Sequence, residues 1–86
     1  MIKLLTANGE EFDVAWMGVA SMDGGLRFGV INSTAEKIFS IFTVPENCTV
    51  LTRVFDGVEK EYEGYTVFRG MTINYNDEIV VSMSKN

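Results

Sequence analysis

The sequence contains no histidine, and its 86 residues include only one cysteine and one proline. Without histidine, the general base that most often activates a nucleophilic serine or cysteine is missing. The single Cys48 excludes an internal disulfide and is too few for a cysteine-based zinc site, so we expect a buried, inert thiol. We therefore predict no catalytic residue, no metal and no cofactor, and a protein that is not an enzyme.

Long hydrophobic runs and a basic surface are also lacking. No apolar run approaches the ~20 residues that span a bilayer, and the start, Met1–Leu5, has no signal-peptide pattern. The net charge is −5, with three basic and five acidic residues in 1–43 and four and seven in 44–86. Nucleic-acid backbones and anionic membranes attract positive charge. We expect neither as a direct partner, and we expect a cytoplasmic protein or one that acts after cell lysis.

A chain of 86 residues and 9.6 kDa has room for a single domain, residues 1–86. At this size only about 60–65% of the unfolded chain's surface is buried, so oligomerisation is a common source of added stability. The hydrophobic fraction of 47% and the mean hydropathy of +0.11 favour self-association.

Pairs of turn residues divide the chain into strands. Asn8-Gly9, Asp23-Gly24 and Asp56-Gly57 suit tight hairpin turns, and Asn76-Asp77 is a weaker break. Apolar residues tend to alternate between these turns, which is typical of half-buried strands. The expected strands are 2–6, 11–20, 26–31, 48–55, 58–68, 71–75 and 79–84. The residues that share a face within a strand are Phe12, Val14 and Trp16, then Leu26, Phe28 and Val30, then Ile79, Val81 and Met83.

One helix is predicted in the middle of the chain, over about residues 34–43. Ser33 is the expected N-cap, with Glu36 completing a capping box. Val44 precedes Pro45, which disfavours helical geometry and ends the helix. The apolar residues at helical spacing are Ala35, Ile38, Phe39 and Phe42.

The element order β-β-β-α-β-β-β-β defines a β-rich α+β fold of about seven strands. We predict a small barrel or a two-sheet sandwich, with the helix covering one face or filling an open end.

Three glutamates, Glu59, Glu61 and Glu63, alternate along one expected strand and point to the same side of it. They are candidates for an acidic docking stripe or for hard-cation ligands. The interpretation that we favour is a solvated outer face whose charges discourage edge-to-edge pairing. The polar segment 74–78 lacks the spacing of a calcium loop and is explained as a turn.

Large aromatic residues are the other candidates for protein interaction, because they are enriched at interface hot spots. Trp16 is in register with Phe12 and Val14, which favours a core position. For the three tyrosines, core and interface positions remain equally open, and Gly64 is typical of a bulge that re-aims its neighbour. The candidate aromatics are Trp16, Tyr62, Tyr65 and Tyr75.

The C-terminal two thirds follow a recognisable arrangement. A helix at 34–42 is followed by PENCTVL at 45–51, an Asp-Gly hairpin, EYEGYTV at 61–67 and IVVSMSK at 79–85. Over about residues 34–85 this resembles a class of small uncharacterised proteins of prophages and tailed phages of Gram-positive bacteria, found among virion-morphogenesis genes. The resemblance implies a phage-derived structural or accessory protein in the bacterial host cytoplasm or the virion. It carries over no catalytic or ligand residue.

Two functional hypotheses follow. The first is a non-enzymatic component of virion (tail or head) assembly that acts by protein–protein contact with phage structural proteins or as a homo-oligomer. The alternative is a small acidic binder or inhibitor of a host protein, such as a nuclease or polymerase, that presents carboxylates where phosphates would lie. An enzyme ranks third, since it would need a deep polar pocket with strongly perturbed carboxylates.

Overall fold

The computed structural model describes residues 1–86 and contains seven strands and one α-helix. The helix α1 (Ala35–Phe42) and a short 3-10 helix η1 (Pro45–Cys48) lie between the third and fourth strands in the chain. The predicted β-rich fold and its element order are confirmed. The strands are β1 (Ile2–Leu5), β2 (Glu11–Val19), β3 (Leu26–Ile31), β4 (Val50–Phe55), β5 (Val58–Glu63), β6 (Val67–Ile73) and β7 (Ile79–Ser84).

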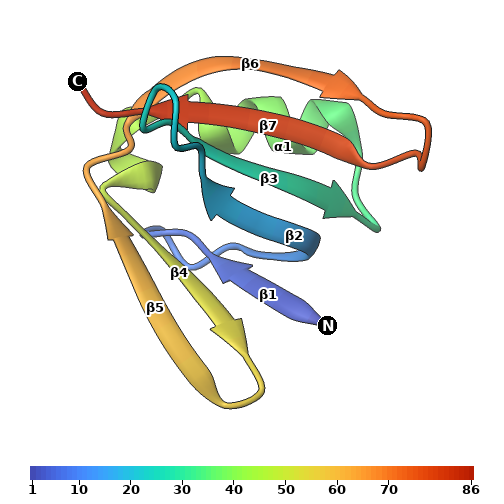
Figure 1. Cartoon of the computed structure of the whole chain (residues 1–86), viewed down its shortest axis with the longest axis horizontal. Helices are drawn as coiled ribbons and strands as arrows, with labels where there is room; N and C mark the ends of the chain where they lie inside the picture. The colour runs from blue at the N-terminus through green and yellow to red at the C-terminus, as the bar shows by residue number, and fades with distance from the viewer.

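All seven strands belong to one antiparallel sheet with the order β5-β4-β1-β2-β3-β7-β6. The strands therefore form one continuous sheet and not two packed ones. Figure 1 shows a strongly bent sheet with α1 behind β3, β7 and β6, while the β4–β5 hairpin extends away from the helix. We call the face that packs on α1 the inner face, the opposite face the outer face, and the β4–β5 hairpin the arm.

The core lies between the inner face and α1. Phe42 of the helix contacts the rings of Phe12 and Phe28, with a centroid distance of 5.1 Å in both cases. An isolated helix of this length is marginal in water, so these contacts are what stabilise it. The buried residues of the core are Leu4, Phe12, Val14, Leu26, Phe28, Val30, Ile38, Phe42, Cys48, Leu51, Tyr62, Tyr65, Ile79, Val81 and Met83.

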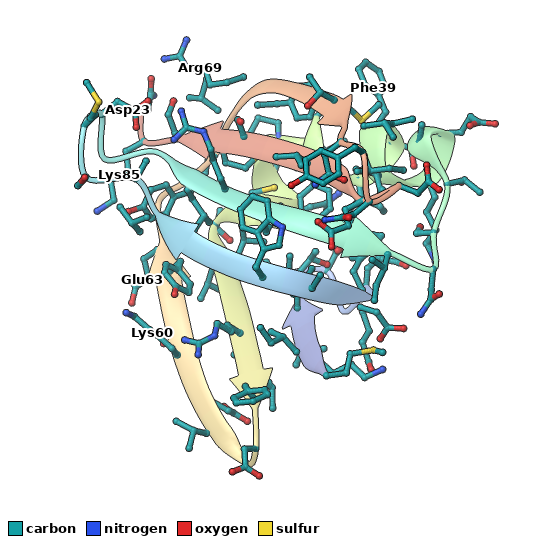
Figure 2. The ribbon with its side chains drawn as sticks, turned by 45° about the vertical axis from the view of Figure 1, so that its right-hand side comes forward. Asp23, Phe39, Lys60, Glu63, Arg69 and Lys85 are labelled. Carbon is teal, nitrogen blue, oxygen red and sulfur yellow. The ribbon has the colours of Figure 1, made fainter.

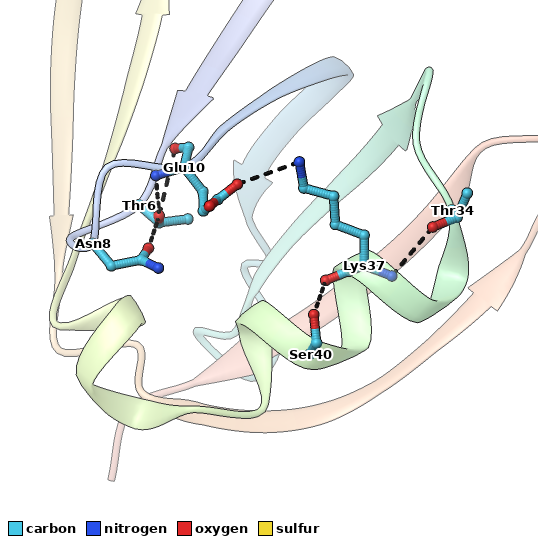
Figure 3. A network of polar contacts seen from close by, with 6 residues as sticks. All are labelled: Thr6, Asn8, Glu10, Thr34, Lys37 and Ser40. Carbon is cyan, nitrogen blue, oxygen red and sulfur yellow. Dashed lines mark hydrogen bonds and ion pairs between the residues drawn. The ribbon is translucent and has the colours of Figure 1, made fainter.

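The helix begins one residue later than the sequence predicted. Thr34, not Ser33, is the N-cap, and its Oγ1 accepts a hydrogen bond from the backbone N–H of Lys37 at 3.2 Å. Thr34 has the extended backbone of an N-cap, with φ −111° and ψ 154°. In Figure 3 the ammonium of Lys37 also reaches Glu10, 3.3 Å away, which ties the helix to the β1–β2 turn.

The break between the fifth and sixth strands is also displaced from its predicted place. The expected strand 58–68 ends at Glu63, where Gly64 adopts φ 83° and lets the chain leave β5. The bulge lies instead inside β6, where the register shifts between Phe68 and Gly70. Both glycines were visible in the sequence, but their roles were exchanged in the prediction.

Candidate functional site

Trp16 lies on the outer face, so the core position favoured by its register in the sequence is wrong. A bulge in β2 between Val14 and Trp16 adds one residue against β3, and the side chains beyond it change face. Trp16 therefore pairs with Gly29 and is 37% exposed, while Met17 takes the inward position.

The indole of Trp16 lies over β3 because Gly29 leaves room for it. A Cβ placed on Gly29 would be only 2.6 Å from the indole Nε1. This nitrogen donates a hydrogen bond to Glu78 Oε1 at 3.0 Å, and Asn74 Nδ2 donates to the same oxygen at 2.8 Å. The indole is thus tied to the β6–β7 turn, which also carries Tyr75, the most exposed tyrosine at 96%.

The other two candidate tyrosines belong to the core. Tyr62 and Tyr65 are buried and pack edge to face, with a centroid distance of 6.4 Å. The ammonium groups of Lys60 and Lys85 lie over their rings at 5.2 and 5.1 Å. The structure therefore separates the four aromatic candidates into a buried pair and two residues on or beside the outer face.

Glu59, Glu61 and Glu63 are exposed and share the outer face of β5. The four ion pairs of the structure involve none of them. They lie opposite three residues of β4, which are Val54, Thr52 and Val50 in that order. The acidic stripe is thus a free carboxylate surface flanked by two valines.

The inner face of the arm is a feature that the sequence analysis missed. Its residues pair across the two strands in three rows, from the buried base to the exposed tip: Leu51 with Tyr62, Arg53 with Lys60, and Phe55 with Val58. In the tip row, 45% of Phe55 and 68% of Val58 is exposed. A two-residue turn at Asp56-Gly57 fixes this register, so the rows could have been derived from the sequence.

The largest cavity, about 460 Å³, lies where β1 and β2 meet the start of the helix and is lined mainly by polar residues. Asp13 accepts hydrogen bonds from Lys3 Nζ at 2.5 Å and Asn32 Nδ2 at 3.0 Å. The bond with Asp13 raises the pKa of Lys3, and the bonds from Lys3 and Asn32 lower the pKa of Asp13. Both groups are therefore charged at neutral pH, which suits neither to proton transfer there.

Two smaller cavities open on the outer face. One, of about 280 Å³, lies beside Trp16 and is mostly apolar. The other, of about 300 Å³, contains Arg69, whose Nε donates to Ser84 Oγ at 2.7 Å, and Arg27, whose Nη2 lies 2.8 Å from Asp23 Oδ2. This cavity of about 300 Å³ therefore holds an ion pair, and the hydrogen bond from Arg27 lowers the pKa of Asp23.

Cys48 is fully buried at the end of η1. Burial raises the pKa of its thiol to about 11, so the thiol is protonated at neutral pH. Its Sγ lies 3.8 Å from the carbonyl oxygen of Phe42, a weak hydrogen-bond contact within the core. Cys48 thus packs as a small apolar residue.

No group of three or more His, Cys, Asp or Glu side chains is placed to hold a metal ion. Neither helix has the length and apolar character needed to cross a membrane.

Comparison of the chain with protein-family models, curated proteins and solved structures finds no match.

Proposed function

We propose that the protein acts without catalysis, by protein–protein contact, as a phage-derived structural or accessory component of virion (tail or head) assembly. It would work in the bacterial host cytoplasm or in the virion. The resemblance of residues 34–85 to small phage proteins supports the phage origin. The contact function is supported mainly by one observation, the inner face of the arm.

The arm presents apolar surface that nothing else in the chain covers. Phe55 and Val58 are direct cross-strand partners at its tip, and 45% of Phe55 and 68% of Val58 is exposed. In β3 and β7, the corresponding inward positions belong to the buried core. The tip lies beyond Val54, the last residue of β4 that pairs with β1, so only β4 and β5 pair there. A two-stranded ribbon is only marginally stable in water, so the tip gains from a partner that covers its apolar side.

The test is a paired substitution at the tip of the arm, Phe55→Ser with Val58→Thr. We expect weaker self-association in light scattering across concentration, and weaker co-purification with the phage tail or capsid proteins. The matched control is Val19→Thr with Met22→Ser, which changes two exposed apolar residues near the β2–β3 turn. A wild-type protein that stays monomeric and retains no phage structural protein would contradict the proposal.

A second candidate function, an acidic binder that inhibits a host protein, is supported by the free carboxylates of Glu59, Glu61 and Glu63. Such a stripe would attract the basic surface of a nuclease or polymerase, with a strength that decreases as salt is added.

For this second function, changing all three glutamates to Gln should weaken salt-sensitive binding to purified host nucleic-acid-binding proteins several-fold. The control that removes the same charge is Glu36→Gln, Glu46→Gln and Asp77→Asn, at exposed sites that form no ion pair. Binding that is unchanged by the stripe variant, or lowered equally by the control, would exclude the stripe as the contact.

A further inference from the structure

The middle row of the arm places two cations next to each other without an anion. Arg53 and Lys60 are direct cross-strand partners on the inner face, and neither forms an ion pair. The Nε of Arg53 is buried and has no hydrogen-bond partner. Like charges directly opposite each other destabilise a strand pair. In a chain with 12 acidic residues, this row is therefore a site that a carboxylate from outside would stabilise.

The opposite side of the same arm carries the complementary charge. Glu59, Glu61 and Glu63 lie on the outer face, with Val50 and Val54 of β4 beside them. Figure 2 shows Lys60 and Glu63 along β5, on the side of the molecule away from Phe39 and the helix. One face of the arm is thus basic and apolar, and the other is acidic and apolar.

We propose that the arm of one copy stacks on the arm of a second copy, inner face against outer face. The Arg53–Lys60 row would meet the stripe of Glu59, Glu61 and Glu63. Packed sheet faces lie about 10 Å apart, a distance that the side chains of the two faces fill together. This inference rests on the proposed contact function and names its partner as a second copy of this chain.

The apolar residues are necessary to this stack. Ion pairs that remain partly exposed contribute little individually, because solvent screens them. Phe55 and Val58 supply the apolar area on one face, and Val50 and Val54 supply it on the other. The charges then select which face meets which, as charge complementarity does at other interfaces.

The contact is heterologous, because it joins two different surfaces of the same chain. A stack of any length ends in one free inner face and one free outer face, so further copies can add until it closes into a ring or grows into a filament. A two-fold dimer that paired two β5 edges would instead bring glutamates against glutamates, which is unfavourable.

The experiment exchanges the charges and then mixes the variants. Arg53→Glu with Lys60→Glu makes the inner face acidic. Glu59→Lys with Glu61→Lys and Glu63→Lys makes the outer face basic. Each variant alone should lose self-association in analytical ultracentrifugation, by about tenfold or more in the association constant, which corresponds to at least ~1.4 kcal/mol. Mixed in equal amounts, the two variants should regain it, since every inner face again meets an outer face of opposite charge.

The control separates a specific contact from a general effect of net charge. Glu36→Lys, Glu46→Lys and Asp77→Lys give the same net charge as the three Glu→Lys changes in the stripe, at other exposed positions, and leave both faces of the arm unchanged. This control should still self-associate like the wild type, whereas the stripe variant alone should not. Equal loss of self-association in the control and the stripe variant, or no recovery when the two arm variants are mixed, would overturn the proposal. Circular dichroism checks the folding of each variant, and Lys60→Glu alone replaces the double variant if the change at Arg53 unfolds the chain.

Failure of this inference is distinguishable from failure of the contact function. A wild-type protein that is monomeric at all concentrations, but loses a phage structural partner when Phe55 and Val58 are changed, excludes the stack and keeps the contact function. If the tip variant keeps both self-association and partner binding, the stack and the contact function of the arm are both excluded.

Discussion

Two strand pairs of the same sheet, β3–β7 and β4–β5, are both antiparallel but differ in how far their inner faces are buried. In β3–β7 the inward row of Phe28 and Val81 is fully buried under the helix. In the arm the tip row of Phe55 and Val58 is exposed. The difference comes from the second layer, because α1 covers one pair and nothing in the chain covers the other.

This contrast shows what an alternating pattern can establish. Period two determines which residues share a face of the sheet. Whether that face is buried depends on a helix, a second sheet or another chain packed against it. The apolar tip of the arm therefore has the pattern of a core strand without the layer that would make it one, which is why we assign it to contact with a partner.

The largest expected effect tests this contrast directly. Phe28→Ala removes a fully buried ring and should lower the free energy of unfolding by about 3–5 kcal/mol. Phe55→Ala should lower it by only about 1 kcal/mol in the monomer, because nearly half of the residue is already exposed. Urea denaturation at a concentration below any self-association measures both. Equal losses would show that the arm is part of the core and would break the comparison.

The next effect concerns the outer face. Gly29→Ala places a Cβ 2.6 Å from the Trp16 indole, so the ring must move and lose its bond to Glu78. We expect a destabilisation of about 1–3 kcal/mol and a red shift of the fluorescence of this single tryptophan. Gly18→Ala is the matched control, because nothing lies within 4 Å of its Cβ position. Identical spectra for the two variants would mean that Trp16 does not lie over Gly29.

Most of the fold could be predicted from local chemistry. The turns at Asn8-Gly9, Asp23-Gly24 and Asp56-Gly57 separate the strands as expected, and Asp56 and Gly57 both have the positive φ of a tight hairpin turn, 52° and 77°. The faces of β3 and β7 were also predicted correctly. In these segments the turn residues and the alternation agree, so no tertiary information was needed.

The errors fall where one extra residue changes a face. The bulge before Trp16 leaves no signature in the composition of β2, since it arises from how β2 pairs with β3. Gly64 and Gly70 are both compatible with a strand end or a bulge, and only the pairing of β6 with β7 decides between them.

The candidate surfaces were predictable only in part. The sequence shows that Glu59, Glu61 and Glu63 share a face, and the structure adds that no cation pairs with them. The sequence does not show that Tyr62 is buried, because the burial depends on how the base of the arm joins the core.

A smaller effect distinguishes the two possible caps of the helix. Thr34→Ala removes the oxygen that accepts the N–H of Lys37 and should cost about 1 kcal/mol of stability. Ser33→Ala should change it by no more than about 0.5 kcal/mol. Thermal or urea denaturation of the two variants measures the difference. A larger loss for Ser33→Ala would restore the capping box with Glu36 that the sequence suggested.

The smallest expected effect is the pH dependence contributed by Asp13. Its pKa is held below the ordinary value of 3.8 by the hydrogen bonds from Lys3 and Asn32. A carboxyl with a lowered pKa stabilises the folded state above its unfolded pKa, and this contribution is lost as the pH falls through the folded pKa. Asp13→Asn should therefore be less stable than the wild type at pH 7, and the gap should narrow below about pH 4. A gap that stays constant down to pH 2 would show that the carboxylate charge of Asp13 contributes nothing, and that only its hydrogen-bonding shape matters.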